Sequence, residues 1–233
     1  MKQRVQRVVF AVGLMALGGF LAQASAANEA GEAAGPEIED LGDDRYRIGN
    51  ITVDKAANKF TLGGKILHLS QPLEYLAVKT GGYKGYESLL ELETSAVEFQ
   101  LACILVGLDD ADSVKPQFQF DERKLEGQLV DIEISWEVEG QTKTTSAGDA
   151  LASRGPSFED SEWIYIGSQM SPQDGSLLAE TSGTLIGFVH DPLSIIEHRT
   201  GATAGAYGMV TGNAEVLPPE GSPVTITISV VGE

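Results

Sequence analysis

The sequence predicts an α+β fold, with a mainly antiparallel β-sheet, one principal buried helix and a short second helix. Three observations predict this class. Most segments after residue 44 alternate apolar and polar residues and are rich in β-branched side chains, as strands are. Residues 95–108 form the clearest helical pattern, with a start and a stop signal. Gly and Pro residues mark the turns that separate these short segments.

The first predicted strands lie between residues 45 and 93. Their sequences are RYRIGNITVDK, KFTLGGKILHL, LEYLAVKT and YESLLELE. The turn GGYKG at 81–85 separates the last two strands, and its three glycines permit a tight reversal. We therefore expect a hairpin at this turn, with Tyr83 and Tyr86 at its tip or mouth.

The principal helix is predicted from Ser95 to Leu108. Ser95 is a suitable N-cap, and Glu98 follows three residues later, as in a capping box. Apolar residues recur at helical spacing and cover more than one face, so we expect the helix to be mostly buried against the sheet.

The second half of the chain predicts more strands and the short second helix. The strand predicted at the start of QLVDIEISWEVEGQTKTT includes a clean alternation, with Ile132, Ile134 and Trp136 on one face and acidic residues or Ser on the other. Short strands follow in EWIYIGS, GSLLAE and TLIGFVH, and SPVTITISVV closes the chain. The segment DPLSIIEH at 191–198 predicts the short helix, with Asp at the N-cap and Pro at the first position.

The N-terminus predicts export. Basic residues, an apolar stretch of about 15 residues and the small residues Ala24 and Ala26 follow one another as in a secretory signal peptide. We assign 1–26 to the signal peptide, 27–44 to a disordered acidic leader and 45–233 to a single domain. The mature protein is expected in the periplasm or secreted, without a membrane span; an uncleaved N-terminal anchor is the alternative.

Charge and cysteine content exclude several classes of partner and cofactor. The formal net charge of −18 repels nucleic acid and anionic lipid. Cys103 is the only cysteine, so an iron–sulfur cluster and a Cys-ligated zinc site are excluded. Cys103 lies in an apolar run and reads as a core residue. No cofactor is identifiable, and no metal site is predicted.

Candidate binding residues lie in two short stretches next to turns. Tyr86, Glu87 and Ser88 follow the Gly-rich turn, and His190 and Asp191 end a strand before Pro192. A carboxylate beside an imidazole can bind a cation or move a proton, so we expect Glu87 to lie near His190 and Asp191. The alternative is structural: a plain hairpin with Tyr packing, and a helix N-cap at Asp191.

Several stretches together resemble the YdjY-domain family of exported bacterial proteins. They are LEYLAVKTGGYKGYESLLEL, AVEFQLACILVGLD, VDIEISWE, WIYIGS, SGTLIGFVHDP and LPPEGSPVTITI. The resemblance implies a domain of unknown function, without an agreed activity or cofactor. Members often carry a His immediately before the Glu-Ser pair, where this chain has Tyr86. That departure argues against a His-dependent site at this turn.

Three functions remain open at this stage. The first is a non-catalytic exported domain that binds a small ligand, a cation or another envelope protein. The second is an enzyme with an unfamiliar carboxylate/His site, because no known catalytic motif is present. The third is a structural or assembly domain without a ligand.

Overall fold

The computed structural model describes residues 35–158 and 162–232, and the fold that they form is mainly β. Strands account for 39% and helices for 12% of the structure. Eight strands close into a barrel and further strands extend from it, so the α+β prediction is wrong. The predicted signal peptide at 1–26 lies outside the described residues, and residues 36–232 belong to one compact unit.

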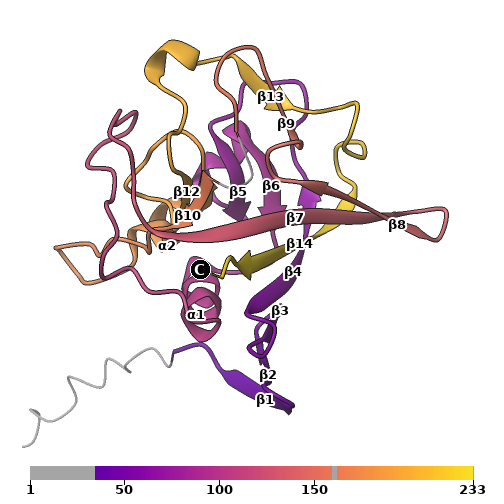
Figure 1. The fold of residues 1–233 in the computed structure, drawn as a ribbon, viewed down its shortest axis with the longest axis vertical. Helices are drawn as coiled ribbons and strands as arrows, with labels where there is room; N and C mark the ends of the chain where they lie inside the picture. The colour runs from indigo at the N-terminus through magenta and orange to yellow at the C-terminus, as the bar shows by residue number, and fades with distance from the viewer. Residues whose placement is uncertain (1–34, 159–161, 233) are drawn as a thin grey trace, which may run out of the picture. The chain divides into compact units, whose positions relative to one another are not determined.

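Each barrel strand pairs with two others around the ring (Figure 1). The order is β4 (Lys59–Ile66), β14 (Pro223–Val230), β7 (Gln128–Val138), β10 (Trp163–Tyr165), β12 (Ile196–His198), β11 (Thr184–Gly187), β5 (Tyr75–Lys79) and β6 (Ser88–Leu92), which pairs back to β4. Two of the pairings, β11 with β12 and β5 with β6, are parallel. The others are antiparallel, as the sequence predicts for most of the sheet.

Six further strands lie outside the ring. They are β1 (Ile38–Gly42), β2 (Arg45–Ile48) and β3 (Ile51–Asp54), which extend from β4; β8 (Gln141–Ser146), which pairs with β7; and the separate pair β9 (Leu151–Ser153) and β13 (Val210–Gly212). Strand β1 corrects the predicted leader at 27–44. Its residues pair with β2, and Glu39 binds Arg47 at 3.1 Å, so the ordered chain begins before residue 45.

The barrel wall follows the period of two that the sequence shows. Along β7, Val130, Ile132, Ile134 and Trp136 are buried, whereas the acidic residues between them are exposed, which confirms the predicted alternation. The same alternation in β4 and β14 directs apolar side chains inward. Strands β5, β10 and β11 are buried almost throughout; two α-helices contact β11, and the 3-10 helix at 83–87 contacts β5. The barrel interior is therefore a packed core.

The Gly-rich turn does not form the expected hairpin. Strands β5 and β6 run parallel, with Tyr75 beside Ser88 and Lys79 beside Leu92. The chain returns to the start of β5 through a 3-10 helix, η1 (Tyr83–Glu87), which packs along both strands. Gly81 and Gly82 stay at the end where β5 finishes, whereas residues 84–87 return to the barrel end where β5 and β6 begin.

Helix α1 (Ala96–Leu105) covers the barrel end at which β5 and β6 finish, where it contacts β3, β11 and α2 (Leu178–Ser182). The predicted capping box is confirmed: the Ser95 hydroxyl accepts from the Glu98 N–H, and the Glu98 carboxylate accepts from the Ser95 N–H. The helix is less buried than predicted. Phe99 is fully buried, but Ile104 is 51% exposed. Helix α1 therefore covers one end of a β-barrel and is not the principal element of the core.

The short second helix lies elsewhere than predicted. Helix α2 occupies residues 178–182 and overlaps the end of the segment 175–180 that we expected to be a strand. In the predicted helix at 191–198, the Asp191 carboxylate accepts from the Leu193 N–H in a turn, and the chain then enters β12. Strand β12 pairs with both β10 and β11, and this pairing outweighs the local helix signal. Another 3-10 helix, η3 (Ala204–Ala206), follows β12.

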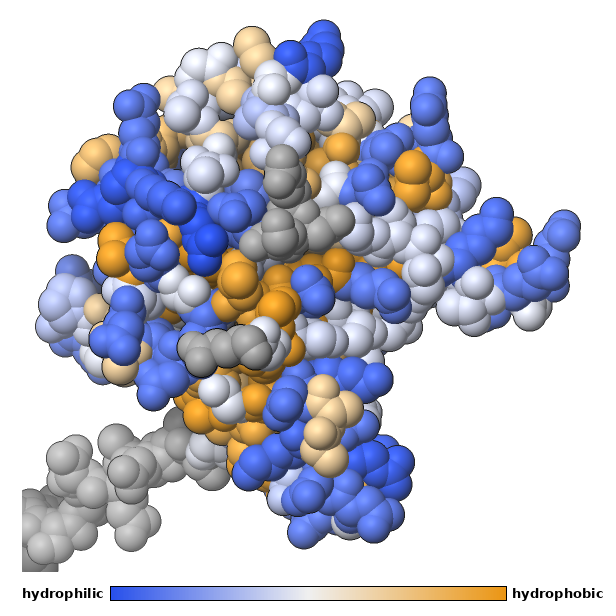
Figure 2. All heavy atoms as spheres, viewed as in Figure 1, coloured by the Kyte–Doolittle hydropathy of each residue, from blue (hydrophilic) through white to orange (hydrophobic). Residues whose placement is uncertain are grey.

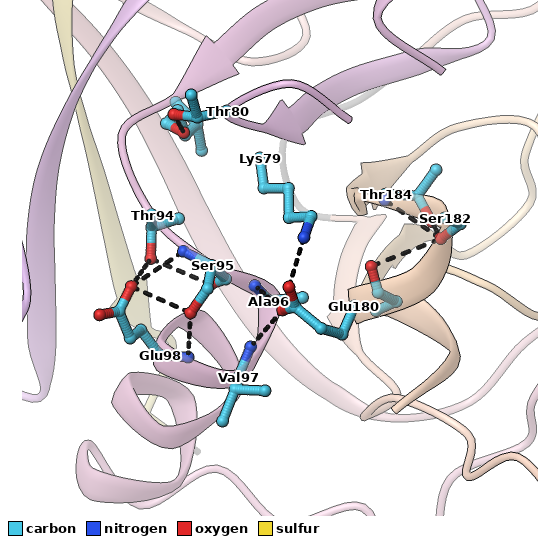
Figure 3. Close-up of polar contacts among 12 residues, drawn as sticks. Lys79, Thr80, Thr94, Ser95, Ala96, Val97, Glu98, Glu180, Ser182 and Thr184 are labelled. Atoms are coloured by element: carbon cyan, nitrogen blue, oxygen red, sulfur yellow. Dashed lines mark hydrogen bonds and ion pairs between the residues drawn. The ribbon is translucent and has the colours of Figure 1, made fainter. Parts of the chain in front are cut away.

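The side chain of Glu180 in α2 binds the N-terminus of α1 (Figure 3). One of its carboxylate oxygens accepts from the backbone N–H groups of Ala96 at 2.7 Å and Val97 at 3.2 Å. The other oxygen binds the Lys79 ammonium at the end of β5. A carboxylate is favoured here because the first N–H groups of a helix lack intrahelical partners and point outward. This network is satisfied by the protein itself, so we interpret it as structural.

Glu180→Ala is expected to lower the free energy of unfolding by about 1–2 kcal/mol, as for the loss of a helix cap. The substitution leaves two N–H groups of α1 and the Lys79 ammonium without the carboxylate. Urea denaturation followed by circular dichroism would measure the loss. Glu215→Ala removes an exposed carboxylate and serves as the control. Equal midpoints for the two variants would contradict the structural role of Glu180.

The face of the protein in Figure 2 is mostly hydrophilic, in keeping with the net charge of −18. Apolar surface appears over α1 and near the end of β14, where Ile104 and Val231 are exposed. Among the described residues, no helix has both the length and the apolar composition that a bilayer crossing requires.

Candidate functional site

The barrel end opposite α1 carries an unusual number of acidic side chains, and we call it the carboxylate end. Strands β5 and β6 both begin there, which places Glu74 and Glu87 side by side; the Glu74 N–H donates to the Glu87 carbonyl at 2.9 Å. The segment that follows β11 crosses the same end, where the N–H of Val189 donates to the Glu74 carbonyl at 3.2 Å. Both candidate stretches from the sequence therefore meet here.

Lys84 and Glu87 form a nearly buried ion pair at this end. The Lys84 ammonium lies 2.6 Å from the Glu87 carboxylate, and the two side chains are 16% and 10% exposed. Burial lowers the pKa of Lys84, but the hydrogen bond and charge of Glu87, together with the nearby Tyr86 and Glu74, raise that pKa overall. The same ammonium lies 5.5 Å from the Tyr75 ring and 5.9 Å from the Tyr86 ring. A cation thus sits among aromatic rings and carboxylates within the protein itself.

Ser88 has a structural role in this arrangement. Its side chain is fully buried, and its hydroxyl donates to the Lys84 carbonyl at 2.8 Å. The bond ties the start of β6 to η1. Ser88 therefore holds Lys84 in place and offers no free group to a ligand.

Two tyrosines of η1 form the outer part of the site. Tyr83 is 76% exposed and Tyr86 is 56% exposed, and their rings meet edge to face with centroids 6.2 Å apart. The Tyr86 hydroxyl lies beside Glu87; burial and then the Glu87 charge raise its pKa. Both rings are exposed to solvent, and Tyr86 lies next to the Lys84–Glu87 pair, an arrangement suited to recognising a cationic group.

Glu74 lies between the outer and inner carboxylates. It is 5% exposed, and one carboxylate oxygen accepts from the Gln119 side-chain amide at 2.8 Å. Burial raises the pKa of Glu74, and the neighbouring charges of Glu87 and Asp191 raise it further, against the lowering effect of Lys84. Glu74 therefore connects the two groups of acidic residues electrostatically.

The inner part of the site is a closed polar network. The Tyr75 hydroxyl donates to the Asp191 carboxylate, and the Asp191 N–H donates to one Glu197 oxygen at 3.2 Å. Glu197 is fully buried, and among the described residues its second oxygen has no hydrogen-bond partner. Burial raises the pKa of Glu197 well above the ordinary value, and the Asp191 charge adds to this effect although Ser194 opposes it. Burial therefore favours the protonated form of Glu197 more than solvent does.

His190 serves the packing of this end. Its two ring nitrogens lie 2.6 Å from the Asp121 carbonyl and 2.9 Å from the His198 carbonyl. Gly201, at φ +57°, lies so close that a Cβ atom there would be 2.5 Å from the His190 ring. Within the described part of the chain, no hydrogen bond or ion pair joins Glu87 to His190. The two share an end of the barrel, with Glu74 and Asp191 between them.

The comparison with known proteins adds a family to this geometry. The sequence model of a protein family, the YdjY domain, matches residues 51–229. The chain belongs to the YdjY-domain family. Curated proteins and solved structures gave no match. The matched range of the YdjY domain runs from β3 into β14 and contains the whole carboxylate end. The resemblance seen in the sequence is confirmed, and the family is one of unknown function.

The sequence analysis of this YdjY domain missed four residues of the carboxylate end. Glu74, Tyr75, Lys84 and Glu197 make the central contacts, yet none was a candidate. A signal was present for two of them: Glu74 and Glu197 are acidic residues in the apolar runs LEYLAV and SIIEH. An acid in a buried strand needs a partner or a raised pKa, so it marks a site for further inspection.

The described residues of the YdjY domain contain no group of three or more His, Cys, Asp or Glu side chains placed to hold a metal ion. Cys103 lies on the buried face of α1, and burial raises its thiol pKa. It therefore has the character expected of a packed core residue.

Proposed function

We propose that this protein is an exported, non-catalytic binding domain that recognises the cationic group of a small ligand at the carboxylate end. The observation that carries the proposal is the exposed edge-to-face pair of Tyr83 and Tyr86, with Tyr86 next to Glu87. Aromatic faces and carboxylates attract the same partner, a positive charge. The N-terminal sequence pattern supports export to the periplasm or the medium.

Lys84 supports the choice of a cation. Its ammonium occupies the inner side of the same aromatic and carboxylate shell, so the surroundings already accommodate a positive charge. Ionised Glu74 leaves the shell with more negative than positive charge. Because the pKa of Glu74 is raised, the shell loses this excess as the pH falls through that pKa. Affinity for a cation should then decrease with falling pH, beginning above the ordinary Glu pKa of about 4.3.

Tyr86→Leu should weaken the binding of tetramethylammonium about tenfold, since an aliphatic side chain lacks the negative ring face. Titration followed by backbone amide NMR shifts of η1 would measure it, with tert-butanol as the neutral probe and sodium chloride at equal ionic strength. Tyr207→Leu is the matched control, because Tyr207 is 67% exposed on another loop. Glu87→Gln should weaken binding as well.

Equal weakening by Tyr207→Leu, or equal shifts with tert-butanol, would contradict cation recognition at this site. A Glu87→Gln variant that loses stability but binds normally would make Glu87 structural. Thermal denaturation of each variant separates these outcomes.

An enzyme with a carboxylate-based site is the second candidate, favoured by the contact between Glu197 and Asp191. Two neighbouring carboxyl groups, one of them with a pKa raised by burial, are an arrangement that can serve proton transfer. We prefer binding because Tyr75, Asp191 and Glu197 are each at most 3% exposed, and a substrate would have to open the barrel end to reach them. The third candidate, a structural domain without a ligand, predicts no response to any probe.

A further inference from the structure

A groove lies on the side of the barrel where the β7–β8 hairpin leaves the wall, and we call it the proline groove. Its volume is about 380 Å³, and it is lined by Ser135, Trp136, Glu137, Val138, Pro218, Pro219, Ser222, Pro223, Val224 and Thr225. Three prolines and a tryptophan give it rigid apolar walls. In Figure 1, β7 and β8 extend beyond the barrel as an arm next to this region.

One edge of β7 is unpaired along the groove. The ladder between β7 and β14 ends at Ser135 and Thr225, although β7 continues to Val138. On its other edge, β7 pairs with β8 as far as Val138 and Gln141. Continued in this register, Pro223 falls opposite Glu137 and has no N–H to donate to it. Residues 136–138 therefore have no ladder partner on the side that faces the groove.

The chain that precedes β14 turns away from this edge. The Gly221 N–H donates to the Ile66 carbonyl at 2.8 Å, and the Ile66 N–H donates to the Ser222 carbonyl at 3.1 Å, so this segment is held against β4. Pro218 and Pro219 form the far wall. The space beside residues 136–138 thus has a backbone edge on one side and apolar side chains around it, as in sites that accept an added strand.

The charges around the groove select one kind of occupant. Glu137 lines the groove and is exposed, Glu139 occupies the adjacent turn, and Glu220 lies between the prolines and Ser222. The whole chain carries a net charge of −18. We propose that the proline groove binds an extended segment of a partner protein that adds to the edge of β7, places an apolar side chain between Trp136 and the prolines, and carries Lys or Arg next to it. This partner site is independent of the carboxylate end.

A fluorescein-labelled octapeptide that alternates Val with Lys or Arg is the probe, and fluorescence anisotropy with the full chain measures binding. We expect saturable binding that an octapeptide alternating Val and Glu does not show. Glu137→Lys should weaken binding about tenfold or more, because it places a like charge at the groove. Glu133→Lys is the matched control: it lies on the same face of β7, is exposed, and does not line the groove.

Equal weakening by Glu133→Lys and Glu137→Lys would overturn the proposal, because it would show attraction to net charge alone. Concentration-dependent dimerisation that Glu137→Lys abolishes would also overturn it and would make a second copy of this chain the occupant. Val138→Lys tests the groove a second time through a 37% exposed side chain. Circular dichroism of all three variants confirms that they are folded.

Discussion

Phe99→Ala is expected to lower the free energy of unfolding by about 3–5 kcal/mol, the range found for large aromatic-to-alanine substitutions in cores. Phe99 is fully buried on the face of α1 that covers the barrel end. Its ring meets Phe60 of β4 edge to face, with centroids 5.4 Å apart. Removing the ring leaves a cavity between the helix and the barrel interior, where the barrel strands cannot move together to fill it.

Urea denaturation of three variants of the same helix measures this effect. Ile104→Ala, at a position that is 51% exposed, should change the free energy of unfolding by no more than about 0.5 kcal/mol. Leu105→Ala should fall between the two, below the 2–5 kcal/mol expected for full burial, because Leu105 is only half-buried. Similar losses at Phe99 and Ile104 would show that α1 does not lie on the barrel with the face described here.

The parts of the fold that local sequence could predict are those that depend on neighbouring residues. The capping box of Ser95 and Glu98 involves residues three apart. The alternation of apolar and polar residues along β7 indicates which of its side chains are buried. Closure of the barrel depends on contacts between distant segments, such as Gly64 of β4 beside Leu92 of β6. No local pattern distinguishes a strand in a closed barrel from one in an open sheet.

The parallel pairing of β5 and β6 shows the same limit. The glycines at 81–85 suit a hairpin, and the prediction of one followed from turn chemistry alone. The 3-10 helix η1 instead carries the chain back, because Leu89 and Leu90 must enter the core beside β5 in parallel register. The prediction of a helix at 191–198 was wrong for a related reason. Asp191 and Pro192 resemble a helix start, but Ile196 pairs with β10 on one side and with β11 on the other.

The candidate site was predicted in part. Tyr86, Glu87, Ser88, His190 and Asp191 do lie at one end of the barrel, but their roles differ from one another. Ser88 and His190 hold backbone groups, while Glu87 pairs with Lys84. Glu74 and Glu197, which link the site, are marked in the sequence by their apolar neighbours, but their contacts follow only from the arrangement of distant strands. Their binding role stays a prediction.

Glu197→Gln should make the protein more stable at pH 8 and should remove part of the dependence of its stability on pH. Glu197 is fully buried next to Asp191 and Tyr75, and burial raises its pKa well above the ordinary value of 4.5. In the unfolded chain the same carboxyl ionises near its ordinary pKa. Between these two pKa values the folded protein binds one proton more than the unfolded chain, so stability falls as the pH rises, by up to about 1.4 kcal/mol per pH unit.

The direction of the pH dependence distinguishes an effect of the raised Glu197 pKa from an effect of side-chain packing alone. Below about pH 4 both states are protonated, and the carboxylic acid and the amide should support similar stability. As the pH rises from there, the stability of the wild type should fall relative to Glu197→Gln until the raised pKa is passed. Gln keeps an oxygen that can accept from the Asp191 N–H and has nearly the same volume, so no cavity forms.

Urea titrations at intervals from pH 4 to pH 9 measure the difference between the two proteins. Glu74, whose pKa is also raised by burial, remains in both and cancels in that difference. Glu215→Gln, at an exposed position, should follow the wild-type profile at every pH. A difference between wild type and Glu197→Gln that stays constant over this range would show that Glu197 is ionised in the folded state. The carboxylate end would then contain a counter-charge for Glu197 in place of a buried proton.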